Sequence, residues 1–234
     1  MERTVMPELL DHLPPADPRA VQSRRDLRRV NLLMGNARRV AGALTRIVRR
    51  PPRSVVELGA GDGSWMVKVA RALPATWRDV RVILVDRQDT VSGKTLAALA
   101  SRGWAPEVVA ADALDWLARS HTRSDVMVAN LFLHHFESNR LRALLDLIAA
   151  HATVFVASEP QRAALSLHAS RMLGVIGCNA VTRHDAVVSV RAGFSDGELT
   201  ALWPGEPSWT IEEGPRGLFT HLFVATRTPK AIYR

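Results

Sequence analysis

The sequence predicts an α/β fold in which a doubly wound, mostly parallel sheet is covered by helices on both faces. Strand-like and helix-like segments alternate from residue 53 onward, as they do in folds built from β-α-β units. Segments such as Val82-Ile83-Leu84-Val85 are apolar throughout, which is typical of strands buried on both faces. Two strand-like segments joined by Gly214-Pro215-Arg216-Gly217 then predict a C-terminal antiparallel hairpin at the edge of the sheet.

The expected elements follow one another in order along the chain. Strands are expected at 54–58, 82–86, 107–110, 126–130 and 153–158, and helices at 65–73, 94–102, 113–119 and 139–151. Ser195-Asp196-Gly197-Glu198 has the pattern of a capping box that starts a helix through Leu202. The hairpin strands are expected at 209–212 and 218–226.

Two segments lie outside this alternation. Residues 19–50 carry apolar side chains three or four positions apart, which predicts two helices separated at Gly35-Asn36 and closed by Pro51-Pro52. We therefore expect an N-terminal helical cap at 1–52 and a main domain at 53–234, with an insertion at about 160–194 over the ligand crevice. The expected lid consists of Leu27, Val30, Leu33, Met34, Leu165, Leu167, Met172 and Leu173, with polar contacts from Asn31, Asn36 and Arg38.

Composition is that of a folded, cytoplasmic protein. The 47% hydrophobic content suffices for a core, so we expect disorder only at the first residues. A single cysteine, Cys178, excludes an internal disulfide and fits a reducing compartment. Runs of about 18 apolar residues, which would predict a membrane span, are missing. The acidic N-terminus also lacks the apolar core of a secretory signal.

The positive charge is concentrated near the N-terminus. Residues 1–53 hold 12 arginines and 5 acidic residues, so they carry +7 of the total charge of +8 and leave +1 for the rest. We interpret this segment as a solvated basic face rather than a nucleic-acid-binding arm. Contact with an anionic membrane surface is a further role open to these helices.

The segment Glu57-Leu58-Gly59-Ala60-Gly61-Asp62-Gly63 links the first strand to the first helix of the main domain. Glycines let the backbone adopt positive φ and let a ligand approach closely, and main-chain N–H groups at a helix start suit a polar ligand. The spacing differs from the dinucleotide pattern G-x-G-x-x-G, because Ser64 stands where the third glycine would be. Glu57 would repel a phosphate and attract a cationic ligand.

This E-L-G-A-G-D-G segment resembles motif I of the class I S-adenosylmethionine-dependent methyltransferases, whose sheet is Rossmann-like. The resemblance covers about residues 53–227, and Asn130 to Phe136 resembles the N-x-x-x-H-H-F segment of the branch that methylates small molecules, including quinone-type rings. It implies S-adenosylmethionine as cofactor, with Asp86 on the ribose and Asp112 on the adenine, although Asp112 also fits a helix cap. The implied cofactor residues are Glu57, Gly59, Ala60, Gly61, Asp86, Arg87, Asp112, Ala113 and Asn130.

The fourth strand end also bears on the acceptor. It lacks the prolines found where amino groups of nucleobases or glutamine are methylated, and Cys178 is far from any cytosine-C5 motif. His135 is the first candidate for a base that takes a proton from a phenol, and His134 and His184 are the others. An equally weighted alternative is that His134 or His135 only hydrogen-bonds the cofactor or closes the crevice, without accepting a proton. The histidine and cysteine spacings predict that no metal is bound.

The predicted function is S-adenosylmethionine-dependent O-methylation of a small, largely apolar aromatic acceptor. A phenol or quinol of a bacterial secondary pathway is the specific expectation. Three alternatives stay open at this point: C-methylation of a quinone ring, methylation of RNA held by the basic N-terminal helices, and a non-catalytic protein that binds the cofactor or merely keeps the fold. The sequence leaves the oligomeric state open.

Overall fold

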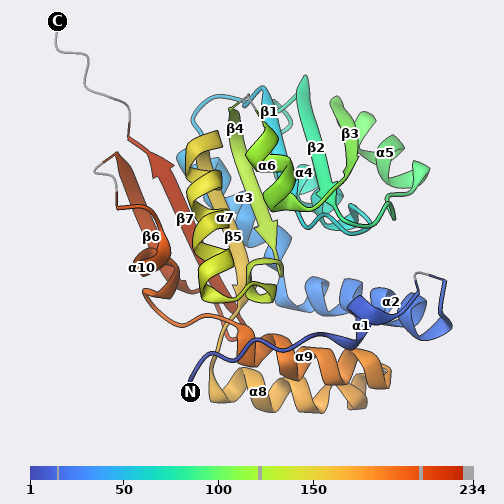
Figure 1. Cartoon of the computed structure of the whole chain (residues 1–234). Coiled ribbons are helices and arrows are strands. Elements are labelled where there is room, and N and C mark those ends of the chain that lie inside the picture. Colours follow the sequence, from blue (N-terminus) through green and yellow to red (C-terminus); the bar gives the residue numbers. More distant parts are fainter. Residues whose placement is uncertain (15, 121–122, 206–207, 229–234) are drawn as a thin grey trace, which may run out of the picture.

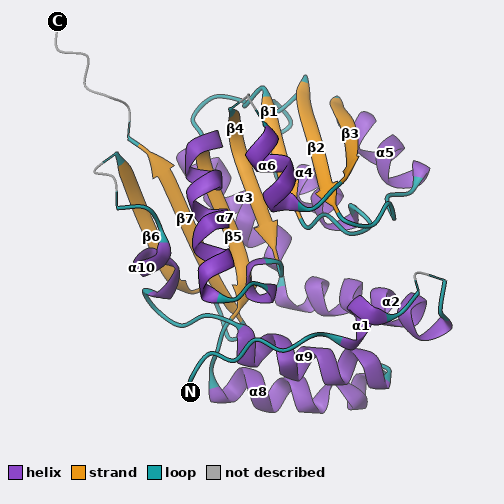
Figure 2. Ribbon diagram, viewed as in Figure 1, coloured by secondary structure: helices purple, strands orange, loops and turns teal. Residues whose placement is uncertain are grey.

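Seven strands form one mixed sheet in the computed structural model, which describes residues 1–14, 16–120, 123–205 and 208–228 (Figures 1 and 2). The strand order is β3-β2-β1-β4-β5-β7-β6. The first five strands are parallel, whereas β7 runs antiparallel to β5 and β6 antiparallel to β7. This confirms the predicted doubly wound sheet and its C-terminal hairpin. The strands are β1 (Ser54–Leu58), β2 (Val80–Asp86), β3 (Trp104–Ala110), β4 (Ser124–Asn130), β5 (Ala152–Pro160), β6 (Trp209–Pro215) and β7 (Thr220–Arg227).

Helices cover both faces of the sheet, and each face has its own hydrophobic core. Buried side chains such as Leu44, Met66 and Leu99 hold α3, α4 and α5 against one face. Leu117, Leu144 and Leu199 hold α6, α7 and α10 against the other. These helices are α3 (Asn36–Ile47), α4 (Ser64–Ala72), α5 (Gly93–Ala100), α6 (Ala113–Arg119), α7 (Ser138–His151) and α10 (Glu198–Leu202).

The third strand begins three residues earlier than predicted. We expected it at 107–110, but β3 begins at Trp104 and includes Pro106. Proline has no N–H to donate, yet β3 is the edge strand and pairs with β2 alone, so one side of it needs no partner. The hairpin also differs, since β6 continues to Pro215 and β7 begins at Thr220.

The remaining helices gather where the parallel strands end. The arrowheads of β4 and β5 point toward a layer formed by α1, α2, α8 and α9 (Figure 1). In this layer α9 packs against both α1 and α2, so the N-terminal segment and the 160–194 segment meet over the strand ends. The elements are α1 (Leu9–His12), α2 (Pro18–Met34), α8 (Ala164–Arg171), the 3-10 helix η2 (Met172–Ile176) and α9 (Ala180–Ala192).

The contact between α2 and α9 is polar, in contrast to the apolar lid that we expected. Asp26 is fully buried and accepts hydrogen bonds from the Asn179 N–H at 2.9 Å and from the Thr182 hydroxyl. Three expected lid residues instead face solvent, because α2 and the insertion bury their polar sides here. Leu33, Leu165 and Met172 are 72%, 53% and 61% exposed.

The domain boundaries at 1–52 and 53–234 stay a prediction, and residues 229–234 of the expected main domain lie outside the described residues. Within the described ranges, no helix is both long enough and apolar enough to cross a membrane.

Candidate active site

A cavity of about 710 Å³ opens at the carboxyl ends of the parallel strands. In an open α/β sheet this edge is where ligands bind, beside the point at which the strand order reverses. Here β1 pairs with both β2 and β4, so the cavity lies at that switch point. Both histidines of the fourth strand end line it, as do all the residues expected to hold the cofactor: Glu57, Gly59, Ala60, Gly61, Asp86, Arg87, Asp112, Ala113 and Asn130.

The glycine turn adopts a conformation that other residues rarely adopt. Gly59, Gly61 and Gly63 have φ of 71°, 54° and 69°. A Cβ on Gly59 would also lie 2.3 Å from the Phe132 ring. Gly59 is therefore required twice, by its backbone angle and by the close approach of the β4 end.

Asp86 joins the turn to the second strand end. One of its carboxylate oxygens accepts from the Gly61 N–H at 2.8 Å, and the other accepts from the Gln88 N–H at 2.9 Å. The carboxylate is therefore fixed in place before any ligand binds. Each oxygen keeps lone pairs for further donors, which suits a pair of ribose hydroxyls.

Glu57 is a buried acid with an unsatisfied oxygen. It is 1% exposed, and its Oε2 has no hydrogen-bond partner among the described residues. Burial, together with the charges of Asp62 and Asp86, raises the pKa of the Glu57 carboxyl well above its usual range. A cationic ligand group in the cavity would satisfy this oxygen and favour the ionised form.

Asp112 is the N-cap residue of α6 and also lines the cavity. Its Oδ1 caps α6 by accepting from the Leu114 N–H at 2.9 Å, and its other oxygen lies 3.9 Å from the Arg140 guanidinium. The side chain also lines the cavity with Ala113, while Arg87 is exposed at the rim.

Asn130 is held by the N-terminal helices. Its Oδ1 accepts from Asn36 at 3.1 Å, and its amide donates to Asn31 at 3.3 Å. Asn36 in turn accepts from Thr220 on β7 at 2.8 Å. Of the three polar residues expected in the lid, Asn31 lines the cavity. Asn36 does not line it but hydrogen-bonds Asn130, and Arg38 is exposed.

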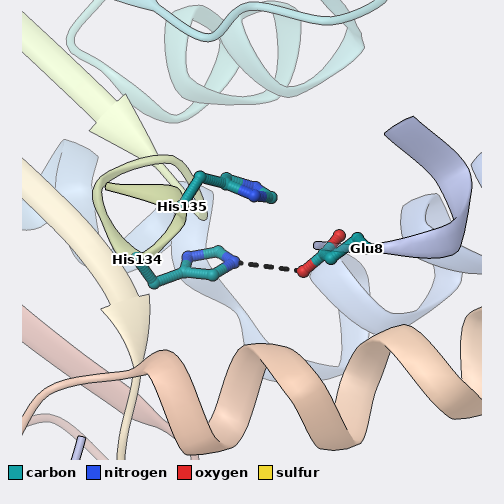
Figure 3. Close-up of side chains that lie close together, drawn as sticks. All are labelled: Glu8, His134 and His135. Atoms are coloured by element: carbon teal, nitrogen blue, oxygen red, sulfur yellow. Dashed lines mark ion pairs between the residues drawn. The ribbon is translucent and has the colours of Figure 1, made fainter. Parts of the chain in front are cut away.

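His134 and His135 occupy the 3-10 helix η1 (Leu133–His135) directly after β4. His134 is buried between two acids, and its Nδ1 lies 2.8 Å from Glu159. Its Nε2 lies 3.4 Å from Glu8, the contact that Figure 3 shows. Burial alone would lower the pKa of His134, but the hydrogen bonds and charges of Glu159 and Glu8 raise it to about 9. His134 is therefore an imidazolium at neutral pH and has no lone pair with which to accept a proton.

His135 has the opposite character. Its side chain is 31% exposed and its Nδ1 lies 3.9 Å from Asp11. Burial and the positive charge of His134 lower the pKa of His135, against the opposing charges of Glu8, Asp11 and Glu159. Of the two histidines, His135 is the one that is neutral at the cavity wall.

Glu8, His134 and His135 also make up a group of the kind that holds metal ions, because one ligand atom from each lies within 4.8 Å of the others. In the arrangement seen here, each ring nitrogen of His134 faces a carboxylate. A proton on each nitrogen satisfies both acids, whereas a metal needs an unprotonated nitrogen. The expectation of no metal stays a prediction.

His184, the third candidate base, does not line the cavity. Its ring is 45% exposed, and its Nδ1 lies 2.9 Å from the carboxylate of Asp185. That carboxylate also accepts hydrogen bonds from the main-chain N–H groups of Leu9 and Leu10 at 2.8 and 3.0 Å. Asp185 therefore anchors the N-terminal segment, and the catalytic role of His184 stays a prediction for a residue outside the cavity.

The first residues, expected to be disordered, are part of the site. We call residues 3–12 the N-terminal strap; Val5, Met6, Pro7, Glu8, Leu10 and Asp11 line the cavity. Sequence reasoning missed this segment because Glu8 and His134 lie 126 positions apart and no motif links them. It also missed Trp65, a buried cavity residue whose indole N–H has no partner among the described residues.

Comparison with known proteins agrees with this geometry. Residues 55–153 match the family described as a methyltransferase domain. The part of the chain from β1 to the start of β5 is thus similar to methyltransferase domains. The matched segment contains the glycine turn, Asp86, Asp112 and the histidine pair, which are the features that build the cavity. A search of curated proteins gave no match.

Solved structures show the same fold at low sequence identity. An O-methyltransferase family protein from Burkholderia thailandensis is 18% identical with a TM-score of 0.62, over 92% of this chain and 61% of that one. The plantazolicin methyltransferase BpumL, solved with S-adenosylhomocysteine, is 12% identical with a TM-score of 0.66, over 91% of each chain. Magnesium protoporphyrin IX methyltransferase from Synechocystis is 14% identical with a TM-score of 0.54, over 94% and 88%. The chain thus spans about three fifths of the Burkholderia protein.

Proposed function

We propose that the protein transfers the methyl group of S-adenosylmethionine to a hydroxyl oxygen of a small, largely apolar aromatic molecule, a phenol or quinol. The observation that carries this proposal is one continuous cavity with two different ends. The glycine turn and the fixed carboxylates lie at one end. A neutral histidine and the aromatic ring of Phe136 lie at the other, and the Phe132 ring, which lies against Gly59 and packs on Phe136, connects the two.

The cofactor fits the residues at the first end. S-adenosylmethionine, when bound, supplies a methyl group on a positively charged sulfur. Glu57 offers a buried oxygen without a partner to a cationic group, and Asp86 offers a fixed carboxylate to ribose hydroxyls. Asp112 and Asn130 complete the set of polar contacts along the same wall.

At the second end, His135 accepts the acceptor's proton. A phenol has a pKa of about 10 and becomes a good nucleophile once a neutral imidazole takes its proton. His134 is charged and buried, so it orients groups rather than accepting protons. Phe132 and Phe136 pack edge to face at 5.0 Å and give the acceptor an apolar wall.

Several neighbours in the structural comparison carry names consistent with this proposal. One is an O-methyltransferase family protein, and another is the mitomycin 7-O-methyltransferase MmcR, which is 18% identical with a TM-score of 0.60 over 94% of this chain and 60% of that one. Two other neighbours are named for plantazolicin and for magnesium protoporphyrin IX, so enzymes named for different acceptors share this fold. The fold alone therefore does not identify the class of acceptor, which is inferred from the residues that line the cavity.

The proposal is tested by turnover with a panel of phenols and quinols, comparing the wild type with His135→Gln. We expect turnover by the wild type and a loss of about 100-fold or more in kcat for the variant, the scale of a general base. Nuclear magnetic resonance of the product locates the new methyl group. A methyl group on a ring carbon would establish the alternative of C-methylation. Full activity of His135→Gln would show that His135 is not the general base.

A further inference from the structure

The His134 ring is held from both sides by acids that come from distant parts of the chain. Glu159 comes from β5, and its carboxylate also accepts the main-chain N–H groups of Phe132 and Leu133 at 3.0 and 2.9 Å. Glu8 comes from the N-terminal strap and faces the opposite ring nitrogen (Figure 3). Removal of either acid would leave the ring held on one side only.

Glu8 is itself fixed by contacts along the strap. The Ser189 hydroxyl on α9 donates to its carboxylate, and Asp185 binds the next two main-chain N–H groups. At the start of the strap, Arg3 donates to the carbonyls of Ala192 and Phe136, each at 2.8 Å. The strap is therefore attached both to α9 and to the loop that follows the histidine pair.

His134 is in turn packed against His135. Their ring centroids lie 4.3 Å apart with an angle of 31° between the planes. In Figure 3 both rings extend toward Glu8 from the same short helix. The position of the His135 ring at the cavity wall thus depends on a neighbour that the two acids hold still.

We propose that Glu8 is a positioning residue of the methyl-transfer site: it clamps the His134 ring against Glu159 and thereby sets the stacked His135 ring toward the acceptor. This inference rests on the proposed function, in which His135 takes the acceptor's proton. It also makes the acceptor end incomplete until the strap has docked, whereas the cofactor end is built without it. None of the contacts described above for Glu57, Gly61 or Asp86 involves the strap.

The test compares Glu8→Gln with a matched control, Glu2→Gln, on the full-length protein. Glutamine has the shape of glutamate and can still bond Ser189, but it lacks the charge that holds the imidazolium. Glu2 lies six residues earlier in the chain and is exposed. Three quantities are measured: affinity for S-adenosylmethionine by calorimetry, kcat with a phenol acceptor, and the protonation midpoint of His134 by nuclear magnetic resonance of the histidine rings.

For Glu8→Gln we expect cofactor affinity within about 2-fold of the wild type and a fall in kcat of about 10-fold or more, because a small misplacement of a reacting group is costly. We also expect the His134 midpoint to fall by at least one pH unit, since one of its two acids is lost. Glu2→Gln should match the wild type in all three. Unchanged kcat and an unchanged midpoint in Glu8→Gln would overturn the proposal.

Two further outcomes are distinguishable. If the wild type methylates none of the acceptors, the proposed function fails, yet the His134 midpoint still reports whether Glu8 holds the ring. The metal content of the purified protein is measured last, by elemental analysis. One equivalent of zinc in the wild type that Glu8→Gln lacks would overturn the proposal, because it would assign Glu8, His134 and His135 to a metal site.

Discussion

At the scale of single residues, the site combines one acid that is destabilised by its surroundings with one histidine that is stabilised in its charged form. Glu57 has its pKa raised by burial and by Asp62 and Asp86. His134 has its pKa raised by Glu159 and Glu8. The Glu57 carboxyl can bind a cationic ligand group, whereas His134 already carries a positive charge. The two ends of the cavity therefore attract ligand groups of different charge.

Glu57→Gln should therefore separate stability from binding. A carboxyl with a raised pKa favours folding below its ordinary pKa, and this contribution is lost as the pH rises through the folded-state value. We expect the ligand-free variant to be about 1 kcal/mol more stable than the wild type at pH 8, and its affinity for S-adenosylmethionine to fall about 10-fold or more. Thermal unfolding and calorimetry measure the two effects, and unchanged affinity would remove Glu57 from the cofactor site.

The substitution Gly59→Ala should lower the stability of the folded protein. The added methyl group would meet the Phe132 ring at 2.3 Å, in a residue with φ of 71°. We expect a loss of about 1–3 kcal/mol in the free energy of unfolding. Gly42→Ala is the matched control, because Gly42 lies within α3 with open space around it and should be stabilising by about 0.5–1 kcal/mol. Equal stability of the two variants would contradict this account of the turn.

At the scale of elements, the N-terminal strap is held against the cavity by the ion pair between Glu8 and His134. Its pH dependence follows from two shifted groups. The pKa of His134 is raised from an ordinary value of 6.5 to about 9, so its contribution to stability is complete below pH 6.5 and is lost as the pH rises through 9. Although burial opposes the shift, the hydrogen bond to His134 lowers the pKa of Glu8 from 4.5 to about 2, so its contribution is lost as the pH falls toward 2.

The strap should therefore be held most firmly between about pH 4.5 and 6.5. The groups that face the His134 ring are Glu8, Glu159 and His135. We expect the wild type to exceed Glu8→Gln in the free energy of unfolding by about 1–3 kcal/mol at pH 6, with the difference shrinking toward pH 9.5. Denaturant unfolding at several pH values measures it. A difference that grows with pH would contradict the assigned charge state.

The order of elements was predictable from the sequence, because apolar runs and helical periodicity are local signals. The gathering of Glu57, Asp86, Asp112 and Asn130 in one cavity was predictable for a related reason. Each lies within two residues of a strand end, and parallel strands bring those ends to one edge. The strap was not predictable, since nothing near Glu8 indicates a partner 126 residues away. The start of β3 was also not predictable, because a proline such as Pro106 is acceptable in a strand only at the edge of the sheet, and the sequence does not show which strand lies there.

At the scale of the whole molecule, the basic charge of the N-terminal segment lies largely on helices whose arginines are partly paired. Arg28 bonds Asp62 at 2.7 Å beside the glycine turn, and Arg46 pairs with Glu212 of the hairpin. These pairs tie the helices to the main sheet and use part of the positive charge. They support the interpretation of a solvated, structural face over an arm for nucleic acid.

Binding to RNA should accordingly be weak, and methyl transfer to a phenol should respond little to salt. A protein that neutralises several phosphates loses affinity by orders of magnitude between about 50 and 200 mM salt. We expect kcat/KM for a phenol to change by less than about 3-fold over that range. Steep salt dependence with an RNA substrate would favour the alternative, and co-sedimentation with anionic liposomes tests the membrane-surface role of the same helices.

The central claim is that one cavity holds S-adenosylmethionine at the glycine turn and a phenolic hydroxyl at His135. The most direct measurement is a reaction of the purified protein with S-adenosylmethionine carrying a ¹³C-labelled methyl group and a panel of phenols and quinols, followed by nuclear magnetic resonance of the products. The account predicts a labelled methyl on oxygen, formed by the wild type and lost in both Asp86→Ala and His135→Gln. A label on ring carbon, or a labelled product that both variants form at the wild-type rate, would contradict it.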